Sequence, residues 1–246
     1  NILKYWALSE KQDFHVIPTD TISISIDKDA VLRSGIMLPD SIRHLKGKEL
    51  KNAIPDKIYI SLKDMRILTK VDMLMLEMLA NCNWERPLYM AISVGEVSKL
   101  KFDHYFVQEG LAFRFTPFDY KKWGNVKGDN NYAIDVERLY ENVMNRYKYG
   151  GLDTPGLYLD ETTLRTCYYH RRLFAQLAKE LIRQGDNTRA RKVLAYAEQA
   201  VPAYNVPEIY ESGSFDIAKA YAALGEKTKA MPLLKNLTAE SEDYIN

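Results

Sequence analysis

The stretch RLFAQLAKELIRQGDNTRARKVLAYAEQAVP, residues 172–202, decides the fold of the second half of the chain. Within it, small residues, a glycine and a proline follow one another at intervals of 5, 7 and 5 residues. This spacing is typical of a tetratricopeptide repeat, in which two antiparallel helices approach closely around a glycine turn. The stretch therefore predicts a helical hairpin. The residues that carry the pattern are Leu177, Ala178, Gly185, Ala190, Ala197 and Pro202.

A partial second copy of the pattern follows 40 residues later, measured from Gly185 to Gly225. The usual period is about 34 residues, so the connection at 203–212 is longer than usual. A third pair of helices is expected from residues 135–149 and 161–184. So few repeats cannot bury all their apolar faces, and we expect them to pack against the first half of the chain. The second copy is carried by Ile217, Ala218, Tyr221, Gly225, Ala230 and Leu237.

The first half of the chain reads as strands around one apolar helix. Residues 21–26, TISISI, alternate apolar and polar side chains, which predicts a half-buried strand. A second strand is predicted at 56–62, a helix at 69–82 and a third strand at 88–93. Strand, helix and strand within about 36 residues have the size of a parallel, right-handed βαβ crossover.

These elements predict an α+β, mostly helical chain. Residues 1–118 would form a small α/β domain with a βαβ unit. This domain would begin with a lead-in at 1–16 and end with a strand at 111–118. Residues 119–246 would form the tetratricopeptide-like helical domain.

The corner between the helix and the third strand holds Asn83, Trp84, Glu85, Arg86 and Pro87. Pro87 ends the helix, because the residue before a proline avoids the helical conformation. Trp84 would then cover the junction, while Glu85 and Arg86 would pair locally or bond to backbone groups at the helix end. The alternative is a polar site in which Arg86 clamps an anion.

The composition excludes several classes of protein. The net charge is only +1, so the chain is not a polycation, and nucleic acid is excluded as a partner. No stretch reaches the roughly 18–20 apolar residues of a membrane span. The first residue is Asn1, so we expect a chain trimmed from a longer protein. Cys82 and Cys167 match neither a zinc pattern nor a disulfide framework, and are expected to be buried thiols.

The sequence lacks the common catalytic motifs: GxSxG, HExxH, GxGxxG and the phosphate loop. Asp153, Asp160 and Glu161 form an acidic cluster, which turn formation and helix capping explain. An unrecognised hydrolase would need Asp153, Glu161 and His170 within hydrogen-bonding reach of one another. The residues therefore indicate an interaction or support module with no catalytic residue, cofactor or metal.

Several stretches together resemble one family: LTKVDMLMLEMLANCNWERPLYMA at 68–91, EGLAFRFTPF at 109–118, IDVERLYENVMNRYKYGGLDTPGLYLDETTLR at 134–165, and the repeat with VPAYNVP at 201–207. They are similar to the soluble C-terminal region of a bacterial family of multi-pass membrane proteins of unknown function. The membrane part of that family resembles the protein O-mannosyltransferases, which are lipid-sugar-dependent glycosyltransferases. Its recurrent motif matches Asn83 to Pro87, and Tyr149, Gly150, Gly151 and Asp153.

The resemblance implies a parent protein that transfers a sugar from a polyprenyl-phosphate donor to protein acceptors outside the cytoplasm. This chain would be its noncatalytic periplasmic part, tethered to the inner membrane. It would bind exported acceptor proteins or support the membrane part of the same chain. Two alternatives remain: a carbohydrate-binding module, in which Trp84 or the late tyrosines stack on a glycan, and the hydrolase.

Overall fold

The computed structural model describes residues 20–63, 67–94, 100, 102–126 and 132–245. The lead-in expected at 1–16 lies outside these residues. By its contacts the chain divides into two compact units. Unit 1 holds Asn1–Gln108 and Ala112–Ala133, and unit 2 holds Glu109–Leu111 and Ile134–Asn246. The sequence boundary after Phe118 differs from this division, because the described residues that follow Phe118 belong to unit 1 as far as Ala133.

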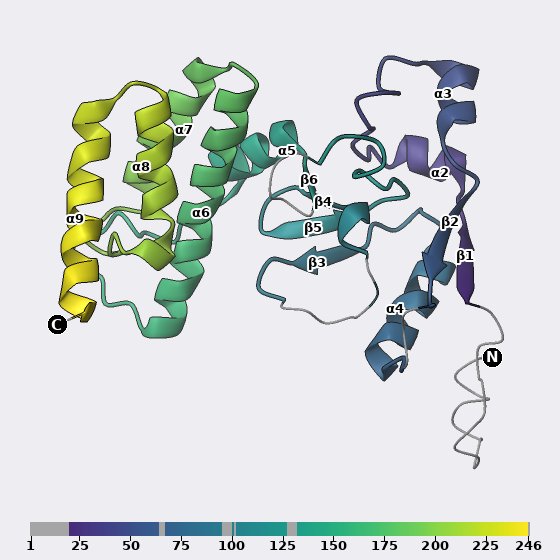
Figure 1. The fold of residues 1–246 in the computed structure, drawn as a ribbon, viewed down its shortest axis with the longest axis horizontal. Helices are drawn as coiled ribbons and strands as arrows, with labels where there is room; N and C mark the ends of the chain where they lie inside the picture. The colour runs from purple at the N-terminus through teal and green to yellow at the C-terminus, as the bar shows by residue number, and fades with distance from the viewer. Residues whose placement is uncertain (1–19, 64–66, 95–99, 101, 127–131, 246) are drawn as a thin grey trace, which may run out of the picture. The chain divides into compact units, whose positions relative to one another are not determined.

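Unit 1 begins with an antiparallel pair of strands (Figure 1). β1 spans Thr21–Ser25 and β2 spans Lys57–Ser61, and Ile24 of β1 lies opposite Ile58 of β2. Both isoleucines are buried, while every second residue of β2 is exposed. The period-two pattern therefore predicted both strands. The helices between them are α2, Lys28–Arg33, and α3, Gly47–Ala53.

The predicted parallel βαβ unit is wrong. α4, Lys70–Asn81, does connect β2 to β3, Tyr89–Ala91, but β2 and β3 belong to different sheets. The physical reason lies in β2, where the side chain of Tyr59 is 64% exposed. Strands inside a parallel sheet are covered on both faces and read as continuous apolar runs. Alternation in β1 and β2 instead suits an antiparallel pair with one covered face.

The second sheet of unit 1 has the strand order β3-β5-β4-β6, and β5 pairs antiparallel with both β3 and β4 (Figure 1). The strand predicted at 111–118 is confirmed as β5. Its residue Phe115 lies in the core, where four aromatic rings surround it at centroid distances between 5.4 and 6.0 Å. The remaining elements are η1, Asp103–Tyr105; β4, Phe106–Gln108; β5, Ala112–Phe115; and β6, Ala133–Ile134.

α4 is more exposed than its apolar sequence indicates. Leu76 and Leu79 are buried, but Val71, Leu74 and Met78 are 40%, 55% and 46% exposed. Apolar residues occupy all faces of this helix, so the helical period cannot select the side that faces the core. The expected covering of most of its faces is therefore wrong.

Unit 2 consists mainly of four helices, α6 to α9, that lie side by side (Figure 1). α6 packs against α5, α7 and α8, and α8 packs against α9. The two predicted helical hairpins are thus formed, and the mixed α+β class is confirmed. The elements are α5, Val136–Glu141; η2, Asn142–Arg146; α6, Glu161–Arg183; α7, Asn187–Ala200; η3, Tyr210–Ser212; α8, Ser214–Ala223; and α9, Lys227–Ile245.

Small residues and glycines have the positions that the sequence pattern requires. Gly185 and Gly225 form the turns of the two hairpins at φ values of +84° and +80°, a left-handed conformation that favours glycine. None of the helices in the described chain combines the length and the hydropathy needed to cross a membrane. The pattern residues that are buried are Leu177, Ala178, Ala190, Ala197, Pro202, Ile217, Ala218, Tyr221, Ala230 and Leu237.

Candidate functional site

The corner after α4 is built around Trp84. Its side chain is 6% exposed, its indole N–H donates to the Ser25 carbonyl at 2.9 Å, and its ring stacks on Phe115 at 6.0 Å. Asn83 and Trp84 have φ values of +49° and +61°, which is unusual for residues other than glycine and most unusual for a bulky one. The burial of the indole in unit 1 holds this strained turn in place.

The charged residues of the corner lie at its surface. Glu85 and Arg86 are exposed. Arg86 and Pro87 border a cavity of about 10 Å³, which is room for about one water molecule. Trp84 is thus the buried residue of the corner, while its charged residues face solvent.

The second motif, from Tyr149 to Asp153, lies in unit 2 and is held by hydrogen bonds to its backbone carbonyls. Gly150 and Gly151 have positive φ values, of 63° and 77°. The Asn205 amide donates to the carbonyls of Leu152 and Thr154 at 2.7 and 2.6 Å. The Tyr204 hydroxyl donates to the Asp153 carbonyl at 2.7 Å. The motif is therefore a loop held by hydrogen bonds, and it belongs to a different unit from the Trp84 corner.

The Tyr149 side chain lies in an aromatic cluster. Its ring is 5.2 Å from that of His170, 5.7 Å from that of Phe174 and 6.0 Å from that of Tyr196. Its hydroxyl donates to the Val143 carbonyl at 2.6 Å. Burial raises the pKa of this hydroxyl well above its ordinary value, so it stays protonated and serves as a donor.

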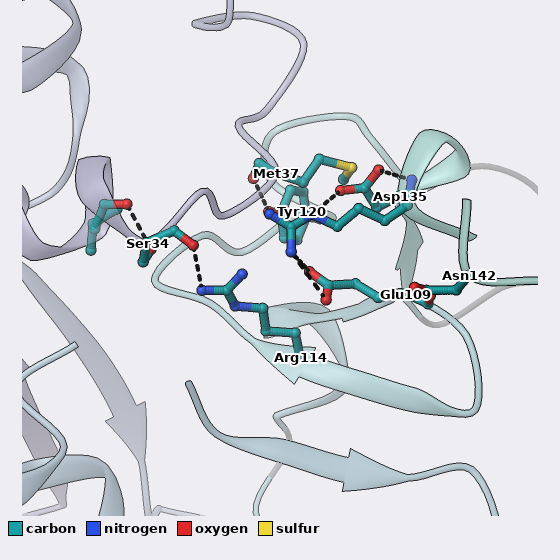
Figure 2. Close-up of polar contacts among 9 residues, drawn as sticks. Ser34, Met37, Glu109, Arg114, Tyr120, Asp135 and Asn142 are labelled. Carbon is teal, nitrogen blue, oxygen red and sulfur yellow. Dashed lines mark hydrogen bonds and ion pairs between the residues drawn. The ribbon is translucent and has the colours of Figure 1, made fainter. Parts of the chain in front are cut away.

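Unit 2 also holds a buried acid that the sequence did not reveal (Figure 2). Glu109 is 6% exposed, and Arg138 lies 3.3 Å from its carboxylate. Asp135 caps α5 by accepting from the Arg138 backbone N–H at 3.1 Å, and burial raises the pKa of its carboxyl. The Asn142 amide donates to the Glu109 carbonyl at 2.6 Å. No sequence signal joins residue 109 to residues 135–142, which explains why this network was missed.

In unit 1, two side chains donate hydrogen bonds to backbone carbonyls, and Figure 2 also shows these bonds. The guanidinium of Arg114, a residue only 4% exposed, donates to the Ser34 carbonyl at 2.9 Å. The Tyr120 hydroxyl donates to the Met37 carbonyl. Both side chains hold the segment after α2 by hydrogen bonds to its backbone, so their role is to stabilise the fold of unit 1.

A groove opens in unit 2 between α7, α8 and α9. Its volume is about 210 Å³. Leu194 and Ile217 form apolar walls, while Glu208 and Lys229 add opposite charges. Lys229 is paired with Glu198 at 3.1 Å. The lining therefore combines apolar surface with charged side chains.

Arg171 forms the floor of this groove. It is 5% exposed, and its guanidinium donates to the carbonyls of Val201, Val206 and Pro207 at 3.1, 2.6 and 2.6 Å. Burial lowers the pKa of the guanidinium. These bonds fasten the long connection between the two helical hairpins to α6.

A second groove, in unit 1, is almost entirely apolar. Its volume is about 230 Å³, and it lies between α4 and β3. Met75, Met78 and Met90 line it, above a floor that includes Phe106 and Phe115. Met75 and Met78 of α4 thus border a groove.

The residues of the hydrolase hypothesis do not converge. Glu161 and His170 lie nine residues apart on α6. At a rise of about 1.5 Å per residue this places them roughly 13 Å apart along the axis. Asp153, Glu161 and His170 therefore do not lie within hydrogen-bonding reach of one another, which the hypothesis required. Within the described residues no three His, Cys, Asp or Glu side chains gather to hold a metal ion. Cys82 and Cys167 are free thiols; Cys167 is buried, as expected, whereas Cys82 is only partly buried.

Together these features define a two-unit α+β module with an apolar groove in unit 1 and a mixed groove in unit 2. The family described as TMEM260-associated domain 2 matches residues 2–137, more than half of the chain. The chain belongs to this family. The match includes the Trp84 corner and ends before Tyr149 and the helical hairpins. Searches among curated proteins and among solved structures found no significant match.

Proposed function

We propose that this chain is a noncatalytic, extracytoplasmic module of a protein O-glycosyltransferase-like membrane protein. The observation that carries the proposal is the groove between α7, α8 and α9, whose lining combines apolar side chains with charged ones. Membership of the TMEM260-associated family supports the link to protein O-mannosyltransferases. In this proposal the sugar transfer takes place in the membrane part of the parent protein.

The helical hairpins are interpreted as tetratricopeptide repeats. Alanines buried between α6 and α7 and between α8 and α9 support this interpretation, as do the glycine turns at 185 and 225. Repeats of this kind use the grooves between their helices to hold extended or helical peptides. The partner would be an exported acceptor protein, presented to the periplasmic side of the membrane enzyme.

The test is capture of exported proteins on this chain. We expect Ala203→Arg and Glu208→Arg to abolish capture, because both residues line the groove and arginine would fill it. Lys179→Glu is the matched control, since Lys179 is exposed on α6 and does not line the groove. If Ala203→Arg and Glu208→Arg captured exported proteins as well as Lys179→Glu does, the groove would be refuted as the acceptor site.

A carbohydrate-binding module is a second candidate, which exposed tyrosines favour. Tyr158, Tyr204 and Tyr210 are 88%, 61% and 66% exposed, so their faces are open to sugar rings. Trp84 does not support this candidate, because its indole is buried. Calorimetric titration with oligosaccharides separates the two functions. A heat of binding that is seen with the wild type and lost in Tyr158→Ala and Tyr204→Ala would favour the sugar site over the peptide groove.

A further inference from the structure

His170 is a half-buried titratable group that the proposed function does not use. It lies on α6, and its Nδ1 atom is buried with no hydrogen-bond partner among the described residues. The rings of Tyr147 and Tyr149 pack against it edge to face, at centroid distances of 6.1 and 5.2 Å. Together with Phe174, the imidazole therefore forms the contact between α6 and the segment that follows η2.

We propose that His170 is a pH-sensitive latch: the neutral ring holds the segment 147–154 on α6, and the protonated ring weakens that attachment. A protonated imidazole carries N–H groups at both nitrogens, so Nδ1–H would need an acceptor. Among the residues that the structure describes, the buried Nδ1 has no such acceptor. Placing a positive charge with an unsatisfied donor in this contact costs more than placing the neutral ring there.

The groups that face His170 do not compensate for this charge. From the segment after η2 they are Tyr147 and Tyr149, and Tyr149 is also in contact with Tyr196 of α7. On α6 itself, the guanidinium groups of Arg171 and Arg172 are cations, which bond to carbonyl groups of the connection between the hairpins. The tyrosine faces could favour a cation, but burial opposes it.

Burial lowers the pKa of His170 below its ordinary value of 6.5. The unfolded chain then binds the proton more readily than the folded chain does, so stability falls as the pH falls. The attachment is at full strength above pH 6.5 and weakens from there through the lower pKa of the folded state. One proton can change the opening equilibrium by at most about tenfold per pH unit.

The segment that His170 holds is part of a larger arrangement within unit 2. The Tyr147 hydroxyl accepts from the Leu111 N–H at 2.9 Å, and Asn205 holds the carbonyls of Leu152 and Thr154. Loss of the His170 contact would therefore loosen 147–151 first, because the asparagine still fastens the end of the segment. This inference does not depend on the proposed acceptor site.

The first measurement is the pKa of His170 in the full chain by proton NMR. The chain has four histidines, and the signal lost in His170→Phe identifies this one. We expect titration below the value of an unfolded histidine. A value at or above it would overturn the proposal, because it would mean that the tyrosine rings stabilise the cation.

The second measurement is hydrogen exchange of the segment 147–154, corrected for intrinsic rates, between about pH 7.5 and pH 5.5. We expect protection to fall by up to about tenfold per pH unit in the wild type and to stay constant in His170→Phe, which keeps an aromatic ring without a titrating nitrogen. His44→Gln is the control, because His44 is exposed in unit 1, and it should behave as the wild type. An equal pH response in His170→Phe and the wild type would refute the latch.

Discussion

At the scale of single residues, Gly213 is a position that combines a left-handed backbone with close packing on α6. Its φ is +87°, and an added Cβ would lie 2.8 Å from Cγ and 3.2 Å from Cα of Arg172. We expect Gly213→Ala to lower the free energy of unfolding by about 2–4 kcal/mol, from backbone strain and overpacking together. Urea denaturation followed by circular dichroism measures this loss.

Gly225→Ala is the control for that prediction. Gly225 has a similar φ of +80°, but nothing lies within 4 Å of an added Cβ. We expect it to lose only the strain component, about 1–2 kcal/mol. Equal losses in both variants would show that close packing of Gly213 on α6 contributes nothing.

Trp84 supports a second prediction at this scale. Trp84→Phe retains an aromatic ring beside Phe115 but loses the hydrogen bond to the Ser25 carbonyl. We expect a destabilisation of about 1–3 kcal/mol, since the carbonyl loses its donor. Trp123→Phe, which retains an aromatic ring against Phe118, should cost less. Thermal unfolding of both variants gives the comparison, and a smaller loss for Trp84→Phe would contradict it.

At the scale of elements, Arg171 joins two parts of unit 2 that are distant in sequence. Arg171→Met would leave the carbonyls of Val201, Val206 and Pro207 without their donor. Removing the buried charge offsets part of that cost, so we expect a net loss of about 2–4 kcal/mol. Chemical denaturation measures it. Arg165→Met, which breaks an exposed pair with Glu161, should cost at most about 0.5 kcal/mol, and a similar cost for both variants would contradict the fastening role.

Elements themselves were predictable where a local period decides them. The spacing of Gly185, Ala190 and Ala197 is set by contacts between two adjacent helices, so the sequence alone located α6 and α7. Alternation located β1 and β2 for the same reason. Pairing between strands depends on residues far apart in the chain, and so the partner of β2 was predicted wrongly. The exposed face of α4 was missed because no period distinguishes its sides.

At the scale of the whole molecule, the candidate sites were the least predictable feature. The Glu109 network joins residue 109 to Arg138 and Asn142, and such distant pairs have no signature in a single sequence. The groove of unit 2 also depends on three helices and the connection between the hairpins. The sequence identified the corner at Trp84, but only coordinates show that its indole is buried and unable to stack on a ligand.

The chain passes between its two units more than once, because Glu109–Leu111 belongs to unit 2 although it connects β4 to β5 of unit 1. An added Cβ at Gly110 would lie 2.0 Å from the Tyr147 hydroxyl oxygen. We expect Gly110→Ala to destabilise unit 2 by about 1–3 kcal/mol through this clash. Because the same three residues close the β4–β5 hairpin, we expect the stability of unit 1 to fall as well.

Tryptophan fluorescence and circular dichroism can separate the two effects. Trp84 and Trp123 belong to unit 1, and residues 134–246 contain no tryptophan, while α6 to α9 dominate the helical signal. Gly110→Ala should lower the denaturation midpoint in both signals. Adding Tyr147→Phe removes the clashing hydroxyl and should restore part of the loss, a coupling that a double-mutant cycle measures. An unchanged fluorescence midpoint in Gly110→Ala would mean that this connection transmits no strain to the hairpin.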